Sequence, residues 1–195
     1  MQESPGLARL QPAILSATIA NFPEEIRQAA APLLAKLAPD TMRQQARLQS
    51  LEAALAGGDI QRGNTLFFGA KAICSTCHTA QARGGKIGPD LSRIGAIRSP
   101  RDLLEAIVYP STSFARGFEP YVITTADGRV HTGIIGREAA DAVFLYDSKR
   151  EEARIPRSEI EQLRQAELSI MPDGLDGQLQ PEELADLVAF LRSLQ

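Results

Sequence analysis

The pentad Cys74-Ser75-Thr76-Cys77-His78 is the feature that most constrains this chain. Two cysteines separated by two residues and followed directly by a histidine form the attachment pattern of a c-type haem. In that chemistry the two thiols form thioethers with the two vinyl groups on one edge of a haem, and the adjacent imidazole is placed under the iron. The pentad therefore predicts one covalent haem c per chain, attached at Cys74 and Cys77, with His78 as an iron ligand.

Two other kinds of site use a Cys-x-x-Cys pair. A thioredoxin-like redox pair is expected between a strand and an opening helix, and no apolar strand precedes Cys74. A zinc site would have to be completed from Cys74, Cys77, His78 and His131, and ligation by the neighbours Cys77 and His78 would be strained. The haem interpretation is therefore preferred.

Composition limits the class of protein. The chain has 195 residues, of which 44% are hydrophobic, and no tryptophan, as expected for a soluble globular protein of one or two domains. No stretch approaches the length of a membrane span. Attachment of a c-type haem takes place outside the cytoplasm, so we expect a periplasmic or otherwise exported bacterial protein. Residues 1–6 lack the basic and apolar parts of a signal peptide, and we expect the chain to come from a longer exported polypeptide.

The charge distribution bears on partners. The net charge of −3 argues against nucleic acid as a partner. Between residues 71 and 101, however, Asp90 is the single acid among six basic residues: Lys71, Arg83, Lys86, Arg93, Arg98 and Arg101. If these groups surround the haem edge they could steer an acidic redox partner, and otherwise they form an ordinary solvated surface.

Residues 1–58 show repeated signals for short helices. Gln11-Pro12 opens one helix, Asn21 caps a second in which Pro23 lies early in the first turn, and Asp40 caps a third after Pro39. Short helices in pairs predict either the end of a HEAT-like repeat array or a separate helical extension.

Residues 59–195 predict a helical domain that is split along the sequence. Asp59 caps a helix that carries Gly63 and runs almost directly into the pentad, and Ser99-Pro100 opens another. Gln180-Pro181 opens the last helix, whose apolar stripe includes Phe190. A first helix with a glycine and an aromatic residue, crossing such a last helix, resembles the helix pair of class I cytochromes c.

An insertion at about residues 119–165 has the pattern of short strands. Five are predicted: Glu119 to Ala126, Arg129 to Ile135 after an Asp127-Gly128 turn, Ala142 to Tyr146, Glu152 to Ile155, and Ile160 to Arg164. They resemble a small SH3-like barrel, although Ser158 and Glu161 also fit a helix capping box. The expected fold class is therefore mainly α, with an inserted antiparallel β subdomain.

The sixth iron ligand would decide the chemistry. Met1 begins the chain and Met42 lies in a polar helical stretch, which leaves Met171, in a Pro- and Gly-containing loop just before the last helix. Class I cytochromes c supply their distal methionine from that place, so Met171 is the predicted ligand. A methionine without a special role is the ordinary alternative. His131 is the competing ligand, although its strand setting favours a surface position.

Together these segments resemble a known family, the PVC-type haem-binding CxxCH domain. The resemblance covers about residues 59–195, and its specific parts are the pentad and Met171-Pro172-Asp173-Gly174. Such domains end large bacterial proteins whose upstream part resembles sugar or alcohol dehydrogenases. The resemblance implies that Pro89 offers its backbone carbonyl to the outer nitrogen of His78. It also implies a fused or partner dehydrogenase as electron donor.

The expected function is that of a monohaem cytochrome domain, which passes single electrons from a dehydrogenase to a downstream cytochrome or oxidase and is not catalytic by itself. Arg98, Arg116 and Tyr121 are candidate partners of the haem propionates. A haem sensor or peroxidase-like domain with a displaceable sixth ligand is the alternative. A haem-free interaction module would require that the chain fold fully without haem.

Overall fold

The computed structural model describes residues 18–195, with the side chains of residues 35–40 left out. The chain forms two compact units, Met1–Ala53 and Ala54–Gln195. The helix predicted to open at Gln11-Pro12 lies outside the described residues. In the part of the chain that the structure describes, no helix is both long enough and apolar enough to cross a membrane.

The first unit contains α2 (Glu24–Ala53), a single helix of 30 residues. Two acidic residues lie in its first turn, where they interact favourably with the helix dipole. The predicted break at Pro39 and the new helix capped at Asp40 are wrong, because the helix runs through both positions. A proline removes one backbone hydrogen bond, but this stretch is rich in Ala, Leu, Gln and Arg, which favour the helix on both sides. Residues 24–53 therefore do not form a pair of short repeat-like helices.

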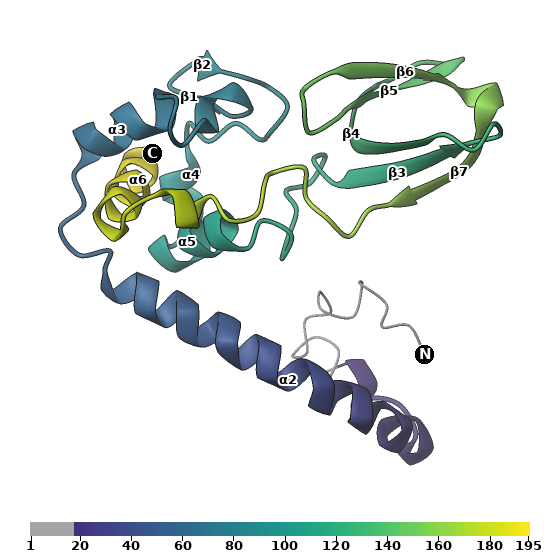
Figure 1. The fold of residues 1–195 in the computed structure, drawn as a ribbon, viewed down its shortest axis with the longest axis horizontal. Coiled ribbons are helices and arrows are strands. Elements are labelled where there is room, and N and C mark those ends of the chain that lie inside the picture. The colour runs from purple at the N-terminus through teal and green to yellow at the C-terminus, as the bar shows by residue number, and fades with distance from the viewer. Residues whose placement is uncertain (1–17) are drawn as a thin grey trace. The chain divides into compact units, whose positions relative to one another are not determined.

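Four helices gather at one end of the second unit (Figure 1): α3 (Ile60–Phe68), α4 (Ile94–Ile97), α5 (Pro100–Val108) and α6 (Pro181–Ser193). Three of them begin where the sequence predicts. The Asp59 carboxylate accepts a hydrogen bond from the Arg62 amide, and Ser99 forms a reciprocal capping box with Asp102. Gln180 caps α6 in the same reciprocal way. Two short 3-10 helices, η2 (Cys74–Thr76) and η4 (Asp176–Gln178), lie in the connections.

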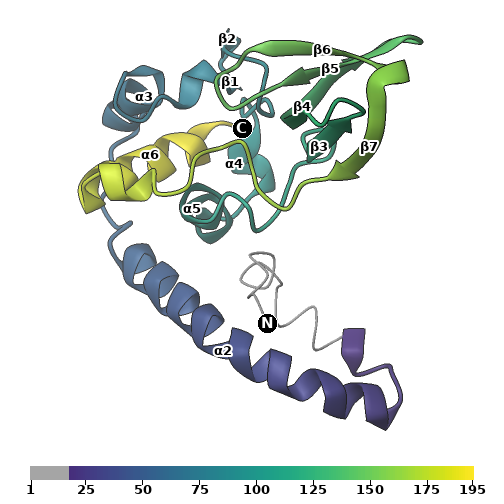
Figure 2. The ribbon, with the colours of Figure 1, turned by 45° about the vertical axis from the view of Figure 1, so that its right-hand side comes forward.

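α3 and α6 cross in close contact, although they are far apart in the sequence (Figures 1 and 2). A Cβ at Gly63 would lie 1.9 Å from the backbone oxygen of Asp186, so only glycine permits this approach. The Phe67 and Phe190 rings pack beside the crossing with their centroids 5.4 Å apart. Gly63 therefore allows the two helices to approach each other closely.

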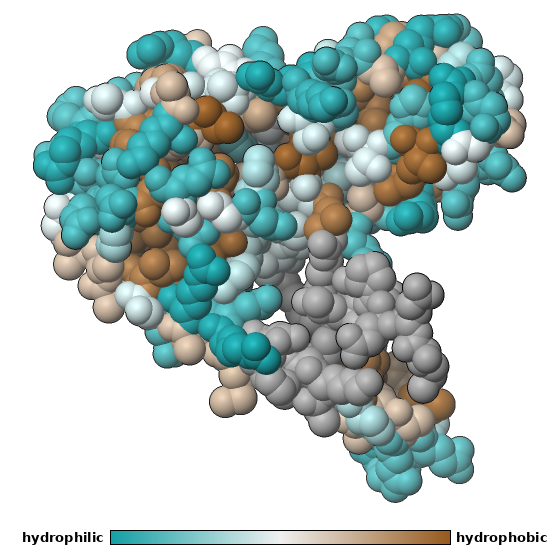
Figure 3. All heavy atoms as spheres, viewed as in Figure 1, coloured by the Kyte–Doolittle hydropathy of each residue, from teal (hydrophilic) through white to brown (hydrophobic). Residues whose placement is uncertain are grey.

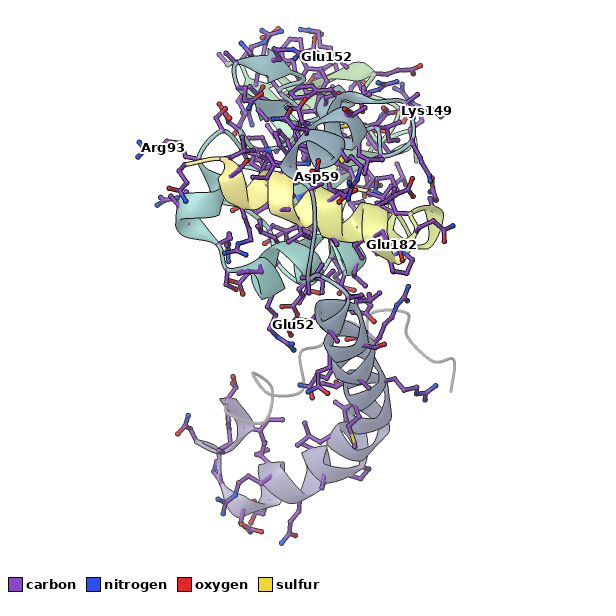
Figure 4. All side chains as sticks on the ribbon, turned by 90° about the vertical axis from the view of Figure 1, so that its left-hand side faces the viewer. Glu52, Asp59, Arg93, Lys149, Glu152 and Glu182 are labelled. Carbon is purple, nitrogen blue, oxygen red and sulfur yellow. The ribbon has the colours of Figure 1, made fainter. Side chains whose placement is uncertain are left out.

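A buried carboxylate fastens the same two helices. Asp186 of α6 is 3% exposed and accepts hydrogen bonds from the Asp59 amide and from the Arg62 guanidinium at 2.6–2.8 Å. Figure 4 shows Asp59 beside α6. The hydrogen bond from Arg62 lowers the pKa of Asp186, and burial opposes that effect only in part. The carboxylate is thus charged and bound at neutral pH.

The other end of the second unit is a five-stranded antiparallel sheet, here called the β unit. Its strands are β3 (Pro120–Thr125), β4 (Val130–Glu138), β5 (Ala142–Tyr146), β6 (Glu152–Pro156) and β7 (Ile160–Gln165), in the spatial order β6-β5-β4-β3-β7. The 3-10 helix η3 (Arg157–Glu159) connects the two edge strands. Ile123, Val143, Leu145 and Ile155 form its own buried core.

The expected fold class, mainly α, is wrong. The structure is about 41% helical and 20% strand, a mixture of helices and antiparallel sheet. All five predicted strands are present, and the strand interpretation of residues 160–165 prevails over the capping-box interpretation. The inserted sheet has a buried core of its own, so it is a main part of the fold beside the helices that pack on α6.

Candidate cofactor site

The pentad begins in a tight, hydrogen-bonded loop. Ile73 has a positive φ of 49°, which turns the chain into η2, and the Cys77 and His78 amides both donate to the Cys74 carbonyl. The loop continues into a two-residue hairpin of β1 (Thr79–Ala80) and β2 (Arg83–Gly84). Gly84 has φ +113° and lies so close to the His78 carbonyl oxygen that a Cβ would be only 2.1 Å away. The backbone therefore holds the five residues in one conformation.

The imidazole of His78 is oriented by a neighbouring backbone segment. Its Nδ1 lies 2.9 Å from the Pro89 carbonyl oxygen. A carbonyl can only accept, so Nδ1 carries the proton and Nε2 keeps its lone pair. Burial lowers the pKa of His78, and the bond to Pro89 opposes this. A neutral imidazole with a free Nε2 is the form that binds a metal.

Gly88 brings that segment against the ring. A Cβ at position 88 would lie 2.6 Å from Cε1 and 2.7 Å from Nδ1 of His78. The Gly88 amide also donates to the Cys77 carbonyl at 2.8 Å. Glycine is thus required for the backbone to pass directly over the imidazole edge.

The two cysteines are free thiols and both are partly buried. Burial raises the pKa of the Cys74 thiol to about 11, and the thiol donates a weak hydrogen bond to the Ala72 carbonyl. Redox-active pairs of the thioredoxin kind instead need a lowered pKa to form the thiolate. The environment of Cys74 therefore disfavours the thiol–disulfide interpretation.

Met171 is positioned by a chain of hydrogen bonds in the loop between β7 and α6. Its amide donates to the Ser169 hydroxyl, and the Ser169 amide donates to the Ser111 hydroxyl, both at 3.1 Å. Gly174, with φ +80°, then turns the chain toward η4 and α6. The loop is therefore tied to the segment that follows α5.

One cavity of about 430 Å³ is lined by all five residues that the sequence singled out: Cys74, Cys77, His78, Pro89 and Met171. The volume lies within the range of about 300–1,000 Å³ that is typical of ligand and cofactor sites. Further walls are mainly apolar and include Ile87, Leu91, Leu103, Ile107, Leu175 and Leu191. Figure 3 shows apolar surface among hydrophilic residues on the second unit.

The donor set and the cavity fit a haem. A haem would need only two further ligands from the protein, and His78 and Met171, two residue types that ligate haem iron, line the same cavity. Among the described residues, no three His, Cys, Asp or Glu side chains gather in a group that could hold a metal ion by themselves. A zinc site built from four protein ligands therefore has no counterpart in that part of the chain.

Of the other candidate residues, one lines the cavity and three do not. His131 lies on β4 opposite Ile123 of β3 and is not part of the cavity wall. Arg98 lines the cavity, whereas Arg116 and Tyr121 do not.

Two members of the basic segment are engaged away from the cavity. Lys71 forms an ion pair with Glu183, and Arg83 stacks on the Phe68 ring at 4.2 Å. The segment is therefore not a uniform ring of free cations around the cavity.

Sequence reasoning missed the contribution of the β unit. Ile134 of β4 and the residues Ser148, Lys149 and Arg150 between β5 and β6 all line the cavity. In the sequence, the adjacent basic residues at positions 149 and 150 indicate only an exposed turn. The structure shows that this turn lines the cavity.

In comparisons with known proteins, no family model matches the chain, and no curated protein matches it in sequence.

Proposed function

We propose that this chain is a c-type monohaem cytochrome domain that carries single electrons. The observation that carries the proposal is convergence: the pentad and Met171 are separated by more than ninety residues, yet they line one cavity. The pentad was singled out by its motif and Met171 by its place before the last helix. Two segments that lie far apart in the sequence but line one cavity favour a shared ligand.

Each residue has a defined role in this proposal. Cys74 and Cys77 supply the thiols for two thioethers, and His78 presents Nε2 because its Nδ1 is held by Pro89. Met171 supplies a soft, neutral thioether, which favours the reduced state and raises the potential relative to two imidazoles. Haem bound there exchanges one electron between the ferrous and ferric states.

The number of protein ligands would set the reaction class. If His78 and Met171 both bound the iron, no position would be left for a substrate, so the arrangement favours electron transfer over ligand binding or peroxidase-like chemistry. The mainly apolar cavity walls would disfavour the additional charge of the oxidised state. One electron is taken from a reduced donor protein and one is passed to an oxidised acceptor.

The wider context belongs to the same proposal. The resemblance to PVC-type CxxCH domains supports a dehydrogenase, fused or separate, as the donor, and a cytochrome or oxidase as the acceptor. A periplasmic or otherwise exported location follows from the compartment in which c-type haems are attached.

The proposal is tested by producing the chain in a periplasm that has haem-attachment machinery. The intact mass should increase by one haem, the haem should remain bound under denaturing conditions, and it should exchange one electron per chain with a redox mediator. The Cys74→Ser/Cys77→Ser variant should lose the covalent haem. A wild-type chain that acquires no haem under these conditions would refute the proposal.

A further inference from the structure

The cavity has walls of two different origins. The pentad loop, α5 and the Met171 loop form the helical side. The β unit contributes Ile134 and the turn between β5 and β6, residues 147–151, here called the β5–β6 turn. The inserted sheet therefore shapes the cavity itself. The inference that follows rests on the proposed haem function.

The β5–β6 turn has a fixed conformation. The Asp147 carboxylate accepts hydrogen bonds from the Lys149 and Glu151 amides at 2.8 and 2.9 Å. The Arg150 amide donates to the Asp147 carbonyl at 3.0 Å, and Arg150 has a positive φ of 72°. The two basic side chains thus start from a defined backbone. Figure 4 shows Lys149 on the β unit, as it does Glu152 just beyond the turn.

The turn brings only positive charge to the cavity. Lys149 and Arg150 line it, and neither forms an ion pair with another residue in the described part of the chain. Elsewhere on the β unit, by contrast, Arg154 pairs with Asp141 and Arg157 with Glu138. Nε of Arg150 donates a hydrogen bond to the Lys149 carbonyl at 3.4 Å, within the turn. The Lys149 ammonium and the terminal nitrogens of Arg150 are therefore available to an anion in the cavity.

The remaining charged groups of the cavity all lie on the helical side. They are Arg98, Asp102 and Glu105. Asp102 accepts a hydrogen bond from the Ser99 amide in the capping box, and its pKa is lowered first by a hydrogen bond with the Ser99 side chain and then by that amide. The acidic groups thus come from α5 alone, so an anionic group in the cavity is favoured on the side of the β5–β6 turn.

If the ligand is a haem, the anionic groups in the cavity are its two propionate carboxylates. The two vinyl groups of a haem lie on one edge and its two propionates on the opposite edge. Thioethers at Cys74 and Cys77 would hold the vinyl edge at the pentad loop, which would leave the carboxylate edge for another wall. We propose that Lys149 and Arg150 bind the carboxylates of the haem, so that the inserted sheet is part of the cofactor site. Lysine and arginine are the natural charged partners of carboxylates.

The test compares wild-type chain carrying covalent haem with the Lys149→Gln/Arg150→Gln variant. The propionate-bending band in the resonance Raman spectrum should shift in the variant. The reduction potential should change in a step at the pH at which a haem carboxylate titrates. In the variant this step should lie about one pH unit higher, because the two cations that lower the pKa of the carboxylate are absent. The charge-conserving variant Lys149→Arg/Arg150→Lys should keep the wild-type values.

Two controls assign the effect. Lys86→Gln/Arg93→Gln removes two exposed cations that do not line the cavity, and it should leave the band and the step unchanged. Glu105→Gln should retain the step. A step that disappears in Glu105→Gln would belong to that side chain and would overturn the inference.

Other outcomes separate the inference from the function on which it rests. A haem-loaded variant whose band and step match the wild type would overturn the inference alone. The inference would also be overturned if the variant changed only the salt dependence of electron exchange with an acidic protein. Lys149 and Arg150 would then act on the carboxylates of a partner and not on those of the haem. A wild-type chain without covalent haem would overturn the proposed function as well.

Discussion

His78 Nδ1 lies 2.9 Å from the carbonyl oxygen of Pro89, which is 11 residues further along the chain. The contact fixes both the tautomer and the direction of the imidazole, because the carbonyl can accept only from a protonated Nδ1. Gly88 makes this contact possible, since its lack of a side chain lets the backbone lie against the ring. The orientation of His78, the proposed iron ligand, thus depends on Gly88.

Gly88→Ala should therefore destabilise the haem-loaded chain. A Cβ 2.6 Å from Cε1 of His78 must push the ring or the backbone aside, and overpacking of this kind costs about 1–3 kcal/mol. Guanidinium unfolding at pH 7 measures the loss. Gly177→Ala is the matched control, because nothing lies within 4 Å of the added Cβ, and it should change stability by less than about 0.5 kcal/mol. Equal effects at both positions would contradict the packing described at His78.

Asp186→Asn should destabilise the second unit in a pH-dependent way. The carboxylate of Asp186 has a lowered pKa in the folded chain, so its contribution is complete above the ordinary aspartate pKa of about 3.9 and is lost as the pH falls through the lower, folded value. At pH 7 the free energy of unfolding of the variant should be about 1–3 kcal/mol lower than that of the wild type. Urea unfolding between pH 7 and pH 3 measures this difference in free energy, which should become smaller below about pH 4.

Glu182→Gln provides the comparison for that experiment, because Glu182 is an exposed acid in the first turn of the same helix (Figure 4). It should have little effect at any pH. A cost for Asp186→Asn that stays constant from pH 7 to pH 3 would show that the charge of Asp186 does not stabilise the crossing of α3 and α6.

Leu145→Ala should destabilise the β unit. Leu145 is 1% exposed in the core of the sheet, and truncation of a buried leucine costs about 2–5 kcal/mol. Leu163→Ala on β7 is the control, because that side chain is 42% exposed and its loss should cost well under about 1 kcal/mol. Thermal unfolding followed by circular dichroism measures both. Similar melting temperatures for the two variants would contradict the assignment of the core.

Local signals predicted the elements of the second unit well. The caps at Asp59, Ser99 and Gln180 and the turn at Asp127-Gly128 depend on a few neighbouring residues, so they can be read directly from the sequence. Pro39 shows where a local signal fails. The cost of one proline is outweighed by the long helix-favouring stretch around it, so α2 continues through this position.

Several contacts between segments that are far apart in the chain could not be predicted from the sequence. Arg62 and Asp186 are 124 residues apart, and no pattern in either segment points to the other. The same holds for Lys149 and Arg150, which reach the cavity only because the sheet is placed beside the helices. The proximity of Pro89 to His78 was expected from the family resemblance alone, since a backbone carbonyl leaves no mark in the sequence.

The most direct test of the central claim is the visible spectrum of the haem-loaded chain, oxidised and reduced, beside the Met171→Ala variant. Met42→Ala and His131→Gln are the controls, because Met42 is 69% exposed on α2 and His131 does not line the cavity. Ligation by His78 and Met171 predicts a low-spin wild type and controls, and a variant at position 171 that becomes high-spin and binds cyanide. A wild type that is already high-spin, or a Met171→Ala variant that remains low-spin, would contradict the account.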